Sequence, residues 1–245
     1  MPFIVYWPIN IFIFSQSTQI SGPTNSIYDS SKISMKKFIK LIGLVLLANS
    51  TACISQDKSY SKPKLIGTCE GCEAIFEYGT TKLKSIDTLP DFNHKGQKIK
   101  ISGTVYKLGG KEPAPNIILY VYHTNQNGIY ENKYNKTNWE RRHGYIRGWV
   151  KTNAKGEFSF FTLKPGTYPN RSEPAHIHLT ILEPNDKYYW LNSYHFDDDP
   201  LMTAKERSSK SVRGGSNGVL HLHRQGDLLV GRRDIELGKN VPGYE

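Results

Sequence analysis

Two histidines separated by one residue are the strongest chemical feature of this 245-residue sequence. His176 and His178 lie in the segment Pro174-Ala175-His176-Ile177-His178-Leu179-Thr180-Ile181. In a β-strand, side chains at i and i+2 point to the same face, so both imidazoles would face one side and the apolar residues the other. Two imidazoles on one strand face can bind a metal ion. By spacing alone, His221-Leu222-His223 is an equally good second pair.

Two tyrosines in turn-forming segments lie upstream of the first histidine pair. Thr162-Leu163-Lys164-Pro165-Gly166-Thr167-Tyr168-Pro169 places one tyrosine in a Pro/Gly turn after a predicted strand. Asn125-Gln126-Asn127-Gly128-Ile129-Tyr130 holds the other, and Gly148-Trp149-Val150-Lys151-Thr152-Asn153 follows it. In content and order, these segments resemble the intradiol ring-cleavage dioxygenases, the non-haem iron family of protocatechuate 3,4-dioxygenase and catechol 1,2-dioxygenase. The resemblance covers about residues 99–199.

The resemblance implies a ferric iron cofactor, Fe(3+), because the family binds this ion with two tyrosinates and two histidines. Phenolate is a hard anionic ligand that suits Fe(III), and metal binding deprotonates tyrosines whose usual pKa is about 10. Tyr134 is an alternative for the first tyrosine, although the Gly-x-Tyr pattern favours Tyr130. Carried over by motif, the expected metal ligands are Tyr130, Tyr168, His176 and His178.

The activity implied by the resemblance is cleavage of a catechol-type ring between its two hydroxyls. In the family, the catechol displaces the tyrosinate that matches Tyr168, and reaction with O2 yields a muconate-type diacid. The expected partners are therefore a small-molecule catechol-type substrate and O2. Family members often associate, which leaves both a monomer and a homo-oligomer open. A non-catalytic exported β-sandwich module that binds carbohydrate or a partner protein is the alternative from another class.

The sequence departs from the family just before the histidine pair. The studied enzymes have an arginine there that helps to stabilise the reacting substrate, whereas this chain has Glu173. A carboxylate beside a dianionic catechol is repulsive unless it turns away and Arg171 or Arg147 supplies the missing positive charge. The expected catalytic residues are therefore Tyr168, Arg171 and Glu173.

Alternating apolar residues predict the elements that position this chemistry. The expected class is all-β, a two-sheet β-sandwich with long functional loops, without a convincing amphipathic helix in residues 97–245. A turn at Asn153–Gly156 separates two of the strands, and Asp197-Asp198-Asp199-Pro200 is expected to be a structural turn rather than a calcium loop. The predicted strands cover residues 99–104, 117–122, 148–152, 157–162, 175–182, 188–196, 219–223 and 234–237.

The first 53 residues have the composition of a targeting segment. Met35 is followed by three lysines, an apolar run at 41–48 too short to span a bilayer, and small residues before Cys53. This pattern resembles a bacterial lipoprotein signal and predicts export to the periplasm or outer membrane with a lipid anchor at Cys53. The expected organisation is an upstream non-native extension at 1–34, a lipoprotein-type signal peptide at 35–53, a tether at 54–66, and the dioxygenase-like domain at 67–245.

Charge and cysteine content exclude other classes. Removing the four lysines and one aspartate of residues 1–53 lowers the net charge from +10 to +7. The remaining positive charges are dispersed, without an arginine-rich helix or an aromatic RNA-binding motif, so no nucleic-acid partner is expected. In an oxidising envelope, Cys69 and Cys72 are expected to form a structural disulfide, because neither a thioredoxin-type context nor further zinc ligands accompany them.

Overall fold

The fold comes from a computed structural model that describes residues 62–133, 138–208 and 211–245. All of these residues belong to one structural unit. The predicted upstream extension, signal peptide and Cys53 lie outside the described residues, as does Tyr134. Of the predicted tether, residues 62–66 are described, and Lys64 and Leu65 form a short edge strand.

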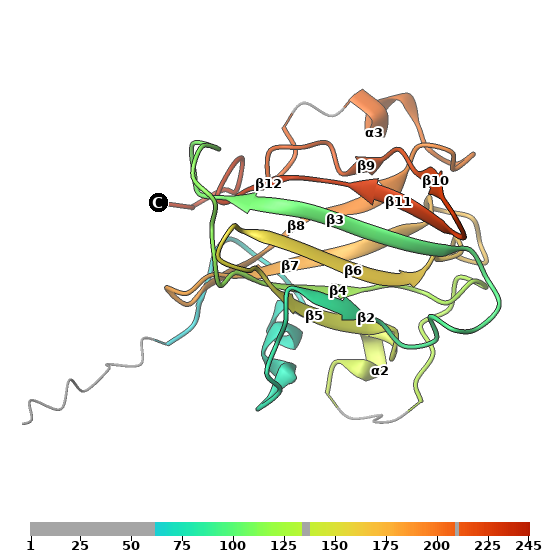
Figure 1. The fold of residues 1–245 in the computed structure, drawn as a ribbon, viewed down its shortest axis with the longest axis horizontal. Coiled ribbons are helices and arrows are strands. Elements are labelled where there is room, and N and C mark those ends of the chain that lie inside the picture. Colours follow the sequence, from blue (N-terminus) through green and yellow to red (C-terminus); the bar gives the residue numbers. More distant parts are fainter. Residues whose placement is uncertain (1–61, 134–137, 209–210) are drawn as a thin grey trace, which may run out of the picture. The chain divides into compact units, whose positions relative to one another are not determined.

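One sheet carries the histidine pair in a central strand. Its order is β1-β8-β7-β4-β5, with β9 beside β8 (Figure 1). Neighbours in the β8-β7-β4-β5 part are antiparallel, whereas β1 and β9 run parallel to β8. The strands are β1 (Lys64–Leu65), β4 (Ile118–Tyr122), β5 (Arg147–Lys151), β7 (His176–Leu182), β8 (Lys187–Phe196) and β9 (Val219–Leu220).

The second sheet is built around the long strand β3. Its order is β10-β11-β3-β6-β2, and β12 also pairs with β3, beyond the part of β3 that pairs with β11. The β3–β6 pair is antiparallel, but β11 and β12 run parallel to β3. The strands are β2 (Ile86–Thr88), β3 (Lys98–Tyr106), β6 (Glu157–Leu163), β10 (His223–Gln225), β11 (Leu228–Arg232) and β12 (Ile235–Glu236).

The two sheets enclose one apolar core. Alternation along the strands places Ile99 and Ile101 of β3, and Ile177 and Ile181 of β7, in this core, where each is 0% exposed. The intervening residues of β7, including both histidines, therefore point to the opposite face of their sheet.

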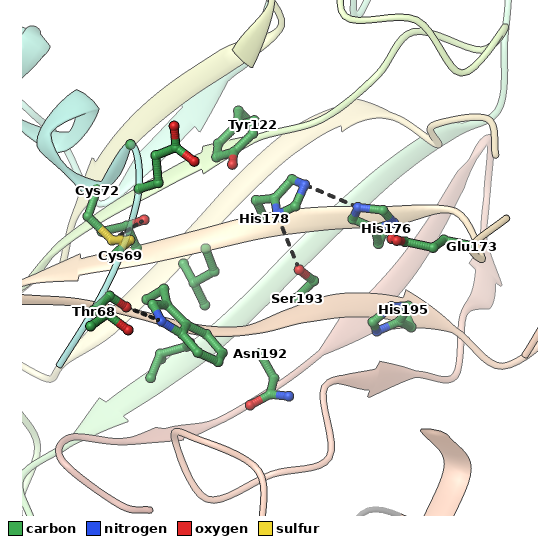
Figure 2. A pocket seen from close by; sticks show the side chains of 16 residues that line it. Thr68, Cys69, Cys72, Tyr122, Glu173, His176, His178, Asn192, Ser193 and His195 are labelled. Atoms are coloured by element: carbon green, nitrogen blue, oxygen red, sulfur yellow. Dashed lines mark hydrogen bonds between the residues drawn. A yellow bond between two sulfur atoms is a disulfide. The ribbon is translucent and has the colours of Figure 1, made fainter. Parts of the chain in front are cut away.

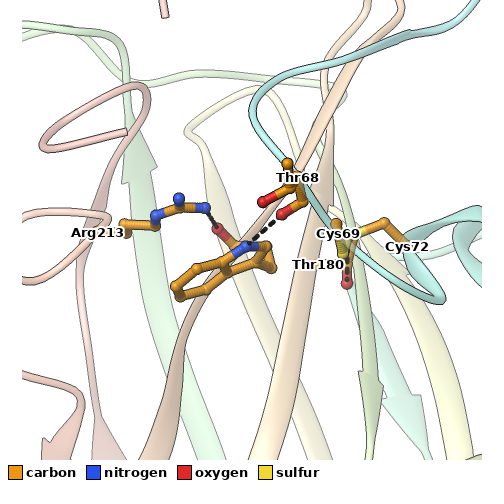
Figure 3. The surroundings of a disulfide bond; sticks show 6 residues. Thr68, Cys69, Cys72, Thr180 and Arg213 are labelled. Carbon is orange, nitrogen blue, oxygen red and sulfur yellow. Dashed lines mark hydrogen bonds between the residues drawn. A yellow bond between two sulfur atoms is a disulfide. The ribbon is translucent and has the colours of Figure 1, made fainter. Parts of the chain in front are cut away.

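A second apolar cluster covers this outer face of the β7 sheet. The 3-10 helix η1 (Cys72–Tyr78) contributes Cys72, Ala74 and Ile75, which pack with Tyr120 of β4 and Leu182 of β7. Because both faces of β4 are covered, its sequence is apolar throughout rather than alternating. The disulfide between Cys69 and Cys72 joins η1 to the segment before it, as expected from the sequence (Figure 3).

The predicted all-β two-sheet sandwich is confirmed, and most predicted strands differ from the observed ones by one or two residues at their ends. Within the described residues after 97, the helices are the short α2 (Glu140–His143) and α3 (Ala204–Ser208). The turn at Asn153–Gly156 joins β5 to β6, which lie in different sheets. The predicted strand at 219–223 is divided between β9 and β10, and the hairpin of β10 and β11 was not predicted. No described helix has the length and apolar character needed to cross a membrane.

Candidate metal centre

The histidine pair lies at the start of β7, on the outer face of its sheet. His178 is paired in register with Tyr122 of β4, and a β-bulge between Ile177 and Leu179 interrupts the pairing with β8. A bulge increases local twist and re-aims side chains, and this one coincides with His178.

Two loops that pack backbone to backbone carry Tyr130 and Tyr168. The buried Asn125 accepts hydrogen bonds from the amides of Asn127 and Ile129, at 2.9 and 3.1 Å, through its side-chain oxygen. The carbonyl oxygen of Asn125 accepts another from the amide of Gly166 at 3.0 Å. Gly128 has a φ of +76°, and a Cβ added there would overlap the carbonyl oxygen of Thr167. Glycine therefore permits the approach that brings the two loops together.

The structure brings the four expected metal ligands into one cluster. The Tyr130 hydroxyl lies 2.9 Å from His178 Nε2 and 3.1 Å from the Tyr168 hydroxyl. The Tyr168 hydroxyl lies 3.3 Å from His176 Nε2, and the two Nε2 atoms are 3.1 Å apart. Two oxygens and two nitrogens thus close a four-membered ring of contacts.

Hydrogen bonding orients His176 toward the cluster. Its Nδ1 donates to the carbonyl oxygen of Pro174 at 2.8 Å, so in the neutral ring Nε2 presents a lone pair. Burial, followed by the charges of neighbouring histidines, lowers the pKa of His178 well below its usual value. The Nε2 atom of a neutral His178 is a second acceptor beside Nε2 of His176. A cation between these two nitrogens would satisfy both lone pairs.

The tyrosines need compensation to ionise. Burial is the largest cause that raises the pKa of Tyr130 and of Tyr168, and the negative charge of Glu173 raises both further. A phenolate at either position therefore requires a nearby positive charge, which a multivalent metal ion would supply.

The donor set and its spacing fit a first-row transition metal. Ligand atoms bound at about 2.1 Å to one ion lie about 2.9 to 3.4 Å from each other, which matches the four contacts above. Among the described residues, no group of three or more His, Cys, Asp or Glu side chains is arranged to hold a metal. A metal ion bound at this cluster would therefore have the two phenolic oxygens as ligands beside the two imidazole nitrogens.

A column of stacked rings supports His178 and was not predicted from the sequence. The ring of Tyr122 lies between His143, at 3.8 Å between centroids, and His178, at 4.4 Å, with both pairs nearly parallel. Trp139 also stacks on His143, at 5.3 Å between centroids. The alternation of Tyr120 and Tyr122 in β4 is a signal for tyrosines on the outer face, but their position beside His178 depends on strand register.

A cavity of about 500 Å³ opens beside the two histidines (Figure 2). His176, His178 and Ser193 lie along it, and the disulfide segment before η1 forms another part of its wall. The sixteen lining residues are Thr68, Cys69, Glu70, Gly71, Cys72, Tyr122, Glu173, His176, His178, Leu179, Thr180, Trp190, Leu191, Asn192, Ser193 and His195.

The charged candidates occupy different places. Glu173 is exposed and lines the cavity next to His176 (Figure 2). Arg171 is exposed, has a φ of +52° and does not line the cavity. Arg147, on β5, forms a 2.5 Å ion pair with Glu77 and is also outside the lining. Neither arginine therefore places a positive charge in the cavity beside Glu173.

The second histidine pair lies away from the cluster. His221 and His223 are exposed, and His221 pairs with Asp197 at 2.6 Å. His195 lines the cavity, with its ring 5.7 Å from that of His176. Asp199 accepts hydrogen bonds from the amides of Ala175 and Leu201, at 2.9 and 2.8 Å, as expected of a structural turn.

Comparison with known proteins identifies the family. A family model described as Dioxygenase matches residues 74–215, which is more than half of the chain. The protocatechuate 3,4-dioxygenase beta chain of Burkholderia cepacia is 30% identical over 113 residues, which are 44% of this chain and 48% of that one. The match thus spans about half the length of that relative. The chain belongs to the intradiol dioxygenase family.

Solved structures of dioxygenases are also similar to the chain. The dioxygenase domain of a carbohydrate-binding fusion protein from Streptomyces sp. SirexAA-E is 20% identical, with a TM-score of 0.47, over 72% of this chain and 98% of that one. Catechol 1,2-dioxygenase from Acinetobacter sp. ADP1 is 16% identical, with a TM-score of 0.47, over 68% and 62% of the two chains. An intradiol ring-cleavage dioxygenase from Tetranychus urticae is 18% identical, with a TM-score of 0.46, over 64% and 88%.

Proposed function

We propose that the protein is an Fe(III)-dependent dioxygenase that opens a catechol-type ring between its two hydroxyls. One O2 is consumed, and both of its atoms enter a muconate-type diacid. The observation that carries this proposal is the cluster of two phenolic oxygens and two imidazole nitrogens, each 2.9–3.3 Å from the next. Membership of the intradiol family supports the choice of reaction.

The side chains of the cluster would divide the work. Tyr130, Tyr168, His176 and His178 would hold the iron, which as a Lewis acid activates a chelated catecholate toward O2. Burial is the largest cause of the raised pKa of Tyr130, and the hydrogen bond of Tyr130 to Tyr168 is the next. The Tyr168 oxygen would accept one proton from the incoming catechol. Glu173 would influence the substituents on the substrate ring from the cavity wall. Arg171 would act only after a rearrangement that brings its side chain into the cavity.

The colour of the protein tests the proposal. Tyrosinate coordinated to Fe(III) gives a charge-transfer absorption, so iron-replete protein should be burgundy, contain about one iron per chain, and consume O2 with catechol. Tyr168→Phe should alter this absorption and abolish most O2 uptake. Colourless protein without iron after iron-replete expression would contradict the proposal and favour the non-catalytic binding module.

The two histidine pairs provide a matched control. His176→Ala or His178→Ala should remove bound iron, measured by elemental analysis of the purified protein. The double variant His221→Ala/His223→Ala removes the same kind of motif from an exposed site and should keep its iron. The opposite pattern would move the metal to the C-terminal pair.

We also propose that residues 35–53 direct export and that Cys53 receives a lipid anchor. The support is the sequence pattern of basic, apolar and small residues before Cys53. Metabolic labelling with a fatty acid in a bacterial host should mark the wild type and not Cys53→Ser. Equal labelling of the two would overturn the anchor.

A further inference from the structure

The charge of the cavity wall indicates which catechols the site accepts. Among the sixteen lining residues there are two carboxylates, Glu70 and Glu173, and no lysine or arginine. His176 and His178 of the metal cluster line this cavity, so a ring bound at the cluster through its hydroxyls would direct its other substituents along this wall. Any charge on those substituents therefore meets the field of the wall residues.

Glu70 contributes little to that field. Its carboxylate accepts a hydrogen bond from Arg142 in an exposed ion pair, which neutralises it. The same contact lowers the pKa of Glu70, as expected for a carboxylate beside a guanidinium. The charge of Arg142 is likewise committed to this pair.

Glu173 has no such partner among the described residues. No hydrogen bond or ion pair joins its carboxylate to another described side chain, and it lies beside His176 on the cavity wall (Figure 2). Glu173 is therefore an acidic wall residue, unpaired among the described side chains, next to a proposed metal ligand.

Arg213 and Arg147 are held outside the cavity by other contacts. Arg213 stacks on the ring of Trp190, at 3.5 Å from its centroid, and donates to the backbone oxygen of Trp190 at 3.4 Å. Arg147 is committed to Glu77, and neither arginine lines the cavity. Glu173 is therefore the uncompensated charge among the lining residues.

We propose that the substrate is a catechol whose ring carries a cationic group, such as a protonated amine, recognised by Glu173. This inference rests on the proposed function, since it assumes that a catechol binds at the metal cluster. A catechol with a ring carboxylate would be repelled at the same place and would bind less tightly. A catechol with an uncharged substituent would have an affinity between these two. For charges about 5 Å apart in a solvated pocket, the difference between cation and anion is about tenfold in affinity.

The test compares three catechols of similar size on iron-loaded protein without O2. The probes are 4-(2-aminoethyl)catechol, 4-ethylcatechol and 3,4-dihydroxyphenylacetate, and the change in charge-transfer absorption gives each Kd. The amine should bind about tenfold more tightly than the carboxylate, with the ethyl compound between them. The ratio should fall as ionic strength rises, because the pocket is open to solvent. Equal binding, or tighter binding of the carboxylate, would overturn the inference.

Variants assign the selectivity to its residue. Glu173→Gln should reduce the amine-to-carboxylate ratio to below about threefold, and Glu173→Arg should invert it. Glu112→Gln makes the same charge change at an exposed residue paired with Lys107, outside the cavity, and should keep the wild-type ratio. An unchanged ratio in Glu173→Gln would overturn the role of Glu173. Failure of all three catechols to bind would overturn the proposed function together with this inference.

Discussion

At the residue scale, the ring of Tyr122 supports the orientation of the His178 ring in the metal cluster. Tyr122 contacts His178 through its flat face and is not one of the four clustered donors. Tyr122→Ala removes this support and should weaken iron binding about tenfold or more, as loss of a contact that orients a metal ligand commonly does. Tyr122→Phe keeps the stacking face and should bind iron nearly as the wild type does. Competition with a chelator measures both, and equal losses in the two variants would contradict a stacking role.

His123 makes the stability of the fold depend on pH. It is 1% exposed and its ring nitrogens are 2.7 Å from the Thr124 carbonyl oxygen and 2.8 Å from Thr162 Oγ1. Burial lowers the pKa of His123 to about 4. The unfolded chain takes up a proton near pH 6.5 while the folded chain does not, so stability is full above pH 6.5 and is lost as pH falls toward 4.

The predicted contribution is a loss of about 2 kcal/mol in the free energy of unfolding between pH 7 and pH 5. Urea denaturation of wild type and His123→Gln at the two pH values should show a smaller drop in the variant by this amount. Comparison in the same metal state removes the contributions of His143 and His178, which both forms share. Equal losses in the free energy of unfolding for wild type and His123→Gln would contradict the assignment of this pH dependence to His123.

At the element scale, the joint between the two tyrosine loops depends on Gly128. An alanine there has an unfavourable φ and overlaps the backbone of Thr167, so the loops must separate. Gly128→Ala should cost about 2 kcal/mol or more in stability and lower the iron content. Gly226→Ala is the matched control, because its φ is +60° but nothing lies within 4 Å of the added Cβ. Gly226→Ala should cost about 1 kcal/mol in stability and keep its iron. Equal iron contents in the two variants would contradict the role of Gly128 in joining the loops.

The elements also show how far the sequence could predict the structure. Alternation in β3 and β7 predicted which residues face the core, because a strand with one polar face leaves a readable period of two. The positions of Tyr130 and Tyr168 came from family motifs, since no period connects two loops. The place of Tyr122 and the disulfide segment at the cavity could not be predicted, because they depend on strand register and on contacts between distant segments.

At the scale of the whole molecule, the buried Arg233 connects the two sheets. It follows β11 and donates to the backbone oxygen of Asn192 in β8 at 2.5 Å, to Ser216 Oγ at 2.7 Å and to the Arg213 backbone oxygen at 3.1 Å. It is 3% exposed, and burial lowers its pKa. These three neutral acceptors satisfy a planar fork that a lysine cannot reproduce.

Arg233→Lys should therefore lower the free energy of unfolding by about 3 kcal/mol, since it leaves acceptors and a charge buried without their contacts. Arg232→Lys changes the adjacent arginine, which is exposed and bonded to Asp234 and Thr104, and should cost less than about 1 kcal/mol. Chemical denaturation of both variants measures the difference. Similar stabilities would show that the sheets are held together without this contact.

The parallel pairing of β3 with β11 has a consequence for how the chain is made. Ile99 is opposite Leu229, so one edge of the central strand β3 remains open until the chain has been synthesised as far as β11. Loop closure over this separation is slow, and an unpaired central edge can join a neighbouring chain. We therefore expect the nascent protein to be prone to aggregation through the open edge of β3 until β11 has emerged and the β3 sheet can close.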